Sequence, residues 1–191
     1  MVITYHGDNF FRIQSGSSTL LVDPTNERMK SDLILKTISS PDFSSEPEEE
    51  NIITSAGEFD INGISIKGVQ IKKESTEKFI KSVFSVSFED IKLCFLGHLS
   101  EDIDSKEIEK LGQVQILFLP VGSPPFLSSQ KASKIIKQIE PSIIIPSFHQ
   151  KDSEKELLEE LGQKGESSEK LTIKSKDIPE KGSQIIILKK G

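Results

Sequence analysis

Histidine and carboxylate side chains are the residues of this sequence that could bind a catalytic metal ion. The chain of 191 residues contains three histidines, His6, His98 and His149. Two histidines and one carboxylate form a known ligand set for a single zinc ion, because both groups bind Zn²⁺ at ~2.0–2.2 Å. His6 precedes Gly7 in a predicted turn and is expected to be exposed rather than functional. His98 and His149 remain as candidate imidazole ligands.

The sequence lacks the motifs of other common kinds of catalytic site. The sequence has no Gly-x-Ser-x-Gly, Gly-x-Gly-x-x-Gly or Gly-x-x-x-x-Gly-Lys-Ser/Thr motif, so neither a nucleophile elbow nor a phosphate-binding loop is predicted. The single cysteine, Cys94, lies within the apolar run KLCFL, where a buried and inert thiol is expected. Ser39 and Ser40 would need a base to act as nucleophiles, and no nearby element supplies one.

Composition narrows the class of protein further. No apolar run approaches the ~18 residues of a membrane helix, and the first residues show no basic leader. With one cysteine, a cytoplasmic location without disulfides is expected. A net charge of −6, one tyrosine and no tryptophan argue against a nucleic-acid partner. We therefore expect neither a membrane nor a nucleic-acid partner. The sequence identifies no protein partner and leaves a homo-oligomer open.

The first half of the chain must position these residues mainly with β-strands. Short runs of β-branched and aromatic residues alternate with Gly, Asp and Ser clusters, which is typical of strands and turns. This pattern predicts strands over Val2–Tyr5, Phe10–Gln14, Thr19–Val22, Leu33–Thr37, Asn51–Thr54, Gly63–Val69, Ser82–Phe88 and Ile91–Phe95.

The second half alternates strands with helices. Helices are predicted over Ser105–Leu111, Ser128–Ile139 and Ser153–Leu161, the first after an Asp104 cap and the last with a Ser153-x-x-Glu156 capping box. Strands are predicted over Val114–Pro120, Ser142–Pro146 and Ile185–Leu188, and the polar stretches Ser44–Glu50 and Gln163–Lys170 are predicted to be mobile. Two facing sheets with helices outside are expected, with Leu33–Thr37, Ile91–Phe95, Ile116–Pro120 and Ile143–Pro146 as core strands.

Five segments, in this order, resemble the metallo-β-lactamase-fold hydrolases, and most closely the small ascorbate-phosphate-lactonase-like branch. They are ITYHGDNFFRIQSGSSTLLVDP (Ile3–Pro24), SDLILKTISSPDFSS (Ser31–Ser45), ITSAGEFDINGISIKGV (Ile53–Val69), IKLCFLGHLSEDIDSKEIEKLGQVQILFLPVG (Ile91–Gly122) and IEPSIIIPSFH (Ile139–His149). The resemblance implies an α/β fold, a four-layer αβ/βα sandwich, as a single domain over residues 1–191. It also implies an active site at one edge of two facing sheets.

The resemblance implies a dinuclear metal site, but this chain lacks most of the family's ligands. The family's His-x-His-x-Asp-His loop aligns with residues 38–43, where the three imidazole positions hold Ile38, Ser40 and Phe43 and only Asp42 matches. His98 replaces the bridging aspartate of the family's Leu-Gly-Asp-Leu turn. Isoleucine and phenylalanine have no atoms that can bind a metal ion. A family-type dinuclear site is therefore not expected.

A different site could have been rebuilt at the same edge. Asp8 replaces a histidine of many relatives, and His149 lies at or one residue beyond the family's last histidine ligand. The resemblance places Asp8, Asp42, His98 and His149 on loops at this edge, with Glu58 and Asp60 nearby. The histidine that the family has after the strand GVQI would fall near Lys72 or Lys73. Lysine does not normally bind zinc. The alternative is thus a mononuclear zinc hydrolase using Asp42, His98 and His149.

We predict a non-catalytic member of this family, a pseudoenzyme that acts as a binding or regulatory protein, with no catalytic residues, metal or cofactor. In the vacated site, Ile38 and Phe43 are expected to turn inward. Asp42 is expected to pair with His98 and to raise the pKa of His98, because a neighbouring negative charge favours the imidazolium. His149 is expected at the rim of this site.

Overall fold

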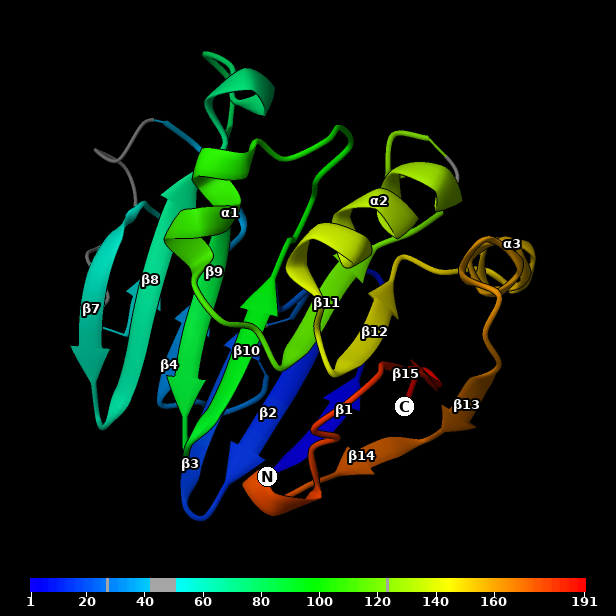
Figure 1. The fold of residues 1–191 in the computed structure, drawn as a ribbon. Coiled ribbons are helices and arrows are strands. Elements are labelled where there is room, and N and C mark those ends of the chain that lie inside the picture. The colour runs from blue at the N-terminus through cyan, green and yellow to red at the C-terminus, as the bar shows by residue number, and fades with distance from the viewer. Residues whose placement is uncertain (27, 42–50, 123) are drawn as a thin grey trace.

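The computed structural model describes residues 1–26, 28–41, 51–122 and 124–191 of the chain. Its strands form two sheets and its helices lie outside one of them, which confirms the α/β fold expected from the sequence (Figure 1). Within the described ranges, no helix is long and apolar enough to cross a membrane.

The first sheet has six strands, and most of them come from the N-terminal half of the chain. Its order is β14-β1-β2-β3-β4-β6. The strands are β1 (Val2–Tyr5), β2 (Phe11–Ser15), β3 (Ser18–Val22), β4 (Leu33–Leu35), β6 (Ile52–Ile53) and β14 (Lys170–Thr172). β3, β4 and β6 run parallel, so their carboxyl ends meet at one edge of the sheet.

The second sheet has nine strands, in the order β13-β15-β12-β11-β10-β9-β8-β7, with β5 paired to β9 off this path. The strands are β5 (Ile38–Ser39), β7 (Gly57–Ile61), β8 (Ile64–Gln70), β9 (Ile80–Phe88), β10 (Ile91–Phe95), β11 (Ile116–Pro120), β12 (Ile143–Ser147), β13 (Gly165–Ser168) and β15 (Gln184–Leu188). β10, β11 and β12 are parallel neighbours, and the continuous apolar runs of β11 and β12 are buried throughout.

The helices are α1 (Ser105–Leu111), α2 (Ser129–Ile139) and α3 (Lys151–Leu161), with short 3₁₀ turns η1 (Lys72–Glu74) and η2 (Ser175–Asp177). α1 begins after Asp104, whose backbone N–H donates to the Glu107 carboxylate at 3.0 Å, and ends at Gly112 with a φ of 69°. α2 is capped by the Ser128 hydroxyl, which accepts from the Lys131 backbone N–H.

Two apolar clusters hold these layers together. The first lies between the two sheets, where Phe95 stacks on Phe118 with ring centroids 4.4 Å apart. The second lies between the nine-stranded sheet and the helices, where Ala132 and Ile135 of α2 pack with Leu117 of β11. Figure 1 shows α1 and α2 over the face of this sheet. The helical spacing of the apolar residues in α2 therefore reflects packing against the sheet.

Two predictions about local structure were wrong. The last helix begins at Lys151, with Gln150 as its cap and Ser153 at the third helical position, so Ser153 is inside the helix rather than before it. The polar stretch Gln163–Lys170 is largely β13 and the start of β14, because backbone pairing to β15 and β1 fixes it without apolar side chains. The other stretch predicted to be mobile, Ser44–Glu50, lies outside the described residues.

Candidate functional site

The candidate site lies where strands of both sheets end at a common edge. Asp23 directly follows β3, Thr37 follows β4, and His98 lies in the turn after β10. The parallel direction of neighbouring strands brings these carboxyl ends together. A cluster of polar side chains in an otherwise apolar interior results.

Asp23, Thr37 and His98 form a continuous hydrogen-bonded network. The Asp23 carboxylate accepts from the Thr37 backbone N–H at 2.7 Å, the Thr37 hydroxyl at 2.5 Å and the Asn9 amide at 2.5 Å. The His98 Nδ1 atom lies 2.8 Å from Thr37 Oγ1 and 3.7 Å from Asp23 Oδ2. Because the Thr37 hydroxyl gives its single proton to Asp23, His98 Nδ1–H must donate to Thr37 Oγ1. The lone pair of neutral His98 is then on Nε2.

Burial governs the protonation of this network. It raises the pKa of Asp23, although His98 and the donors from Thr37 and Asn9 oppose the effect. Burial also lowers the pKa of His98, and the negative charge of Asp23 offsets this lowering only in part. The expected rise in the pKa of His98 is therefore wrong, because desolvation outweighs the nearby carboxylate. His98 is bonded through Thr37 to Asp23, whereas Asp42, its predicted partner, lies outside the described residues.

We expect Asp23→Asn to lower the pKa of His98 further, because the charge that favours the imidazolium is removed while burial remains. The pKa is measured by titrating the His98 ring resonances with NMR. Asp8→Asn is the matched control, since Asp8 is exposed and is the weakest of the charges that act on His98. Its shift should be smaller. An Asp23→Asn variant with an unchanged or raised His98 pKa would contradict the network.

A pair of phenylalanines covers His98. Phe148 follows β12 and meets His98 edge-on, with ring centroids 5.1 Å apart. Phe126 stacks on Phe148 with centroids 3.8 Å apart and an interplanar angle of 14°. An apolar side chain thus covers His98, but it is Phe148, whereas Ile38 and Phe43 were the residues expected to turn inward.

His149 points away from His98. Its Nδ1 atom lies 2.5 Å from Glu154 Oε1, its Nε2 atom lies 3.2 Å from the Leu188 carbonyl oxygen, and its ring stacks on Tyr5. Its side chain is only 9% exposed. The predictions that His149 lies at the rim and joins His98 are wrong, because the left-handed backbone at Phe148 directs Phe148, and not His149, towards the site.

The other candidate residues are dispersed. Asp8 is exposed, and it is its backbone carbonyl that accepts from the Tyr5 hydroxyl and the Phe148 N–H. Ile38 is half-buried in β5 and belongs to neither apolar cluster, and Ser40 is exposed. Asp42 and Phe43 lie outside the described residues. Glu58 and Asp60 are on β7, where Glu58 pairs with Lys67 and Asp60 accepts from Ser65.

Sequence reasoning missed Asp23, Thr37 and Phe148. Asp23 comes directly after the predicted strand Thr19–Val22, and Thr37 is the last residue of the predicted strand Leu33–Thr37. Their position at strand ends could have identified them as site residues, because polar residues at the ends of adjacent parallel strands meet at one sheet edge. Phe148 gave no such signal, because its orientation depends on a positive φ of 53° that an aromatic residue rarely adopts.

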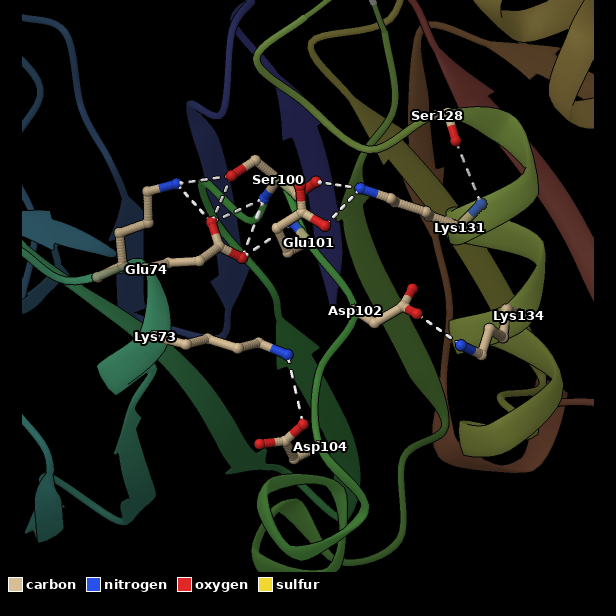
Figure 2. Close-up of polar contacts among 10 residues, drawn as sticks. Lys73, Glu74, Ser100, Glu101, Asp102, Asp104, Ser128, Lys131 and Lys134 are labelled. Atoms are coloured by element: carbon tan, nitrogen blue, oxygen red, sulfur yellow. Dashed lines mark hydrogen bonds and ion pairs between the residues drawn. The ribbon is translucent and has the colours of Figure 1, made fainter.

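The loop that carries His98 is fixed by a charged network on both sides (Figure 2). On one side, the buried Glu74 carboxylate accepts from the Ser100 and Glu101 backbone N–H groups and pairs with Lys81 at 2.7 Å. On the other side, Lys131 and Lys134 of α2 pair with Glu101 and Asp102, each at 2.5 Å. A further pair joins Lys73 to Asp104. Residues 98–104 are therefore held between η1 and α2.

The described donor atoms do not fit a zinc ion. Within the described ranges, no three His, Cys, Asp or Glu side chains are grouped so that they could hold a metal ion. His98 Nδ1 and both Asp23 oxygens are occupied by hydrogen bonds with protein groups, and His149 is bonded to Glu154. A zinc ion needs three or four protein ligands directed at one point. The described network offers His98 Nε2 as a single donor atom.

The fold and the position of this site at a sheet edge identify the class of protein. The sequence profile of the β-lactamase superfamily domain matches residues 2–147, so the chain belongs to the β-lactamase superfamily. Among curated proteins, no sequence matches the chain.

Solved structures show the same fold. A metallo-β-lactamase superfamily protein from Thermotoga maritima has a TM-score of 0.78 and 20% identity, over 98% of this chain and 97% of that chain. The metallo-β-lactamase fold protein YhfI from Bacillus subtilis has a TM-score of 0.68 and 10% identity, over 100% and 97% of the two chains. The metallo hydrolase Igni18 from Ignicoccus hospitalis has a TM-score of 0.66 and 13% identity, over 100% and 95%.

Proposed function

We propose that this chain is a non-catalytic member of the superfamily, which acts by binding a ligand or partner rather than by hydrolysis. The observation that carries the proposal is the network of Asp23, Thr37 and His98 under Phe148. Its polar groups satisfy one another, although at this edge of the fold the family's hydrolases direct such groups at metal ions. The Asp23 carboxylate accepts three hydrogen bonds from protein groups, so its acceptor atoms have partners without a cation.

Metal content tests this proposal. Protein purified without chelator is expected to hold well under one equivalent of zinc, manganese or iron by elemental analysis. Added zinc is also expected to leave the melting temperature unchanged, because a ligand stabilises a protein only when it binds the folded state. His98→Gln is the control, since it removes the one imidazole nitrogen that the network leaves as a donor. Two equivalents of tightly held metal, lost on mutation of Asp42, would refute the proposal.

One observation favours the alternative, a mononuclear zinc hydrolase. His98 donates its Nδ1–H to Thr37 and keeps Nε2 as the acceptor atom, which is the arrangement that orients metal-binding histidines. This alternative predicts about one equivalent of zinc that is lost in both His98→Gln and Asp42→Asn. His149, the third ligand of this alternative, would first have to leave the Glu154 carboxylate and the Leu188 carbonyl that occupy its ring. The zinc content of the purified protein thus distinguishes the two candidate functions.

A further inference from the structure

β7 has a free edge, because it is the last strand of the nine-stranded sheet and pairs only with β8 among the described residues. Figure 1 shows β7 at the outer margin of that sheet. A two-residue turn, Asn62-Gly63, with a positive φ at both residues joins β7 to β8 and sets Ile61 opposite Ile64. In a hairpin with this turn, the flanking residues exchange two hydrogen bonds, and bonded pairs then alternate with non-bonded pairs along the strands.

The backbone groups of Glu58 and Asp60 therefore face outward from this edge. Gly57, Phe59 and Ile61 belong to the bonded pairs with β8, so the N–H and C=O groups of the two residues between them point the other way. The described residues form no backbone hydrogen bond with these four groups. Edge backbone groups of this kind are a template for a further strand.

The side chains of β7 alternate between two chemically different faces. Phe59 and Ile61 are partly buried and pack against the apolar cluster between the sheets. Glu58 and Asp60 are exposed on the opposite face, where they line a hollow of about 500 Å³ beside the end of α1. Glu58 pairs there with Lys67 at 3.1 Å, but 77% of the Glu58 side chain and 43% of the Lys67 side chain remain exposed. Both carboxylates are thus accessible to a charged side chain from an added strand.

A second copy of β7 would not fit this edge. Glu58 and Asp60 are the residues that would form the bonded pairs with an added antiparallel strand. Every antiparallel register that pairs two β7 strands through these residues sets a carboxylate of one copy opposite a carboxylate of the other. Like charges directly opposite each other destabilise a sheet, whereas basic side chains at the same positions would stabilise it.

We propose that the free edge of β7 binds an extended segment of another protein in which basic and apolar residues alternate. The segment adds a strand to the sheet through the backbone groups of Glu58 and Asp60. Its basic side chains lie opposite the two carboxylates, and the apolar side chain between them lies beside Phe59. None of these residues belongs to the network around His98, so binding at this edge does not depend on whether that network holds a metal.

Hydrogen exchange tests this edge in the whole protein, with the acetylated and amidated peptide Val-Lys-Val-Lys-Val as the probe. Peptide at about ten times its dissociation constant should slow exchange of the Glu58 and Asp60 amides about tenfold. The Phe59 amide, which is already bonded to β8, should change little. The peptide Val-Glu-Val-Glu-Val should bind about tenfold more weakly at low salt, because two unlike charge pairs become two like pairs.

Two variants separate the backbone edge from its charges. Glu58→Pro removes an outward N–H that β8 does not use, and an edge strand tolerates proline at such a position. Peptide binding should therefore be lost while the fold is kept. Glu58→Lys combined with Asp60→Lys should reverse the preference in favour of the acidic peptide. Because both side chains are exposed, this double variant should fold even if the proline variant does not.

The proposal is overturned if neither peptide slows exchange of the Glu58 and Asp60 amides, if both peptides bind equally well, or if the double variant keeps the wild-type preference. Binding that survives Glu58→Pro would place the peptide elsewhere and would overturn it as well. Protection of these two amides that increases with protein concentration alone would show that a second copy occupies the edge, which would also overturn it.

Discussion

Replacing Glu74 by glutamine is expected to lower the free energy of unfolding by about 3 kcal/mol, since breaking one partner of a buried ion pair leaves the other charge uncompensated. The side chains of Glu74 and Lys81 are only 4% and 13% exposed. The carboxylate also accepts the Ser100 and Glu101 backbone N–H groups. Urea unfolding of both proteins measures the difference.

Glu101→Gln is the matched control for this variant. It breaks the ion pair with Lys131, but the two side chains are 60% and 37% exposed, so the cost should stay below about 1 kcal/mol. Equal losses in the two variants would mean that burial of Glu74 does not matter. Ser100 lies two residues after His98, so Glu74→Gln should also broaden the His98 ring resonances, whereas Glu101→Gln should not.

The contribution of Glu74 should also depend on pH. Burial raises the pKa of Glu74, but Lys81, Ser100 and the two backbone donors outweigh this effect, and the pKa of Glu74 lies below the 4.5 of an unperturbed glutamate. A carboxylate with a lowered pKa in the folded state stabilises the protein above its unfolded pKa, and this stability is lost as the pH falls through the folded pKa. The stability gap between wild type and Glu74→Gln should therefore narrow below about pH 4.5.

Gly97→Ala is expected to destabilise the protein by about 2–5 kcal/mol, from the sum of a strained backbone and an overpacked site. Gly97 has a φ of 62°, and an added Cβ would clash with the Cβ and hydroxyl of Thr37. Thr37 would have to move, so its hydrogen bonds with Asp23 and His98 should be lost together. Thermal unfolding and the NMR titration of His98 measure the two effects.

Gly162→Ala separates strain from overpacking. Gly162 has the same φ of 62°, with a ψ of 29° in the left-handed region, and an added Cβ would meet nothing within 4 Å. Only the backbone cost remains, about 1–2 kcal/mol. If both alanine variants lose the same stability, the close contact between Gly97 and Thr37 has no energetic importance.

Periodicity and caps predicted the regular elements well. The apolar runs at Ile116–Pro120 and Ile143–Pro146 are buried strands, and α1 begins after Asp104 as expected. These elements carry their own signals, because burial and capping act over a few residues. β13 and β14 have no such local signal, because each forms only by pairing with another strand, β15 and β1 respectively.

The candidate site was harder to predict for a related reason. The family resemblance placed His98 at this edge of the fold, and the structure has His98 in the turn after β10. The sequence could not show that Thr37 would link His98 to Asp23, or that His149 would turn away. Both depend on backbone direction after a strand ends, at Thr37 and at Phe148, which neighbouring elements determine.

The pairing of β14 with β1 has a consequence for how the chain assembles. β14 contributes Lys170–Thr172 to the edge of the six-stranded sheet, opposite residues 2–4. A ribosome makes β1 long before β14, so this edge of β1 stays unpaired while the residues between them are synthesised. Closing so long a loop also slows folding, because the entropy of closure is lost before the strands pair. The edge of β1 is therefore open to pairing with another chain until β14 has been made.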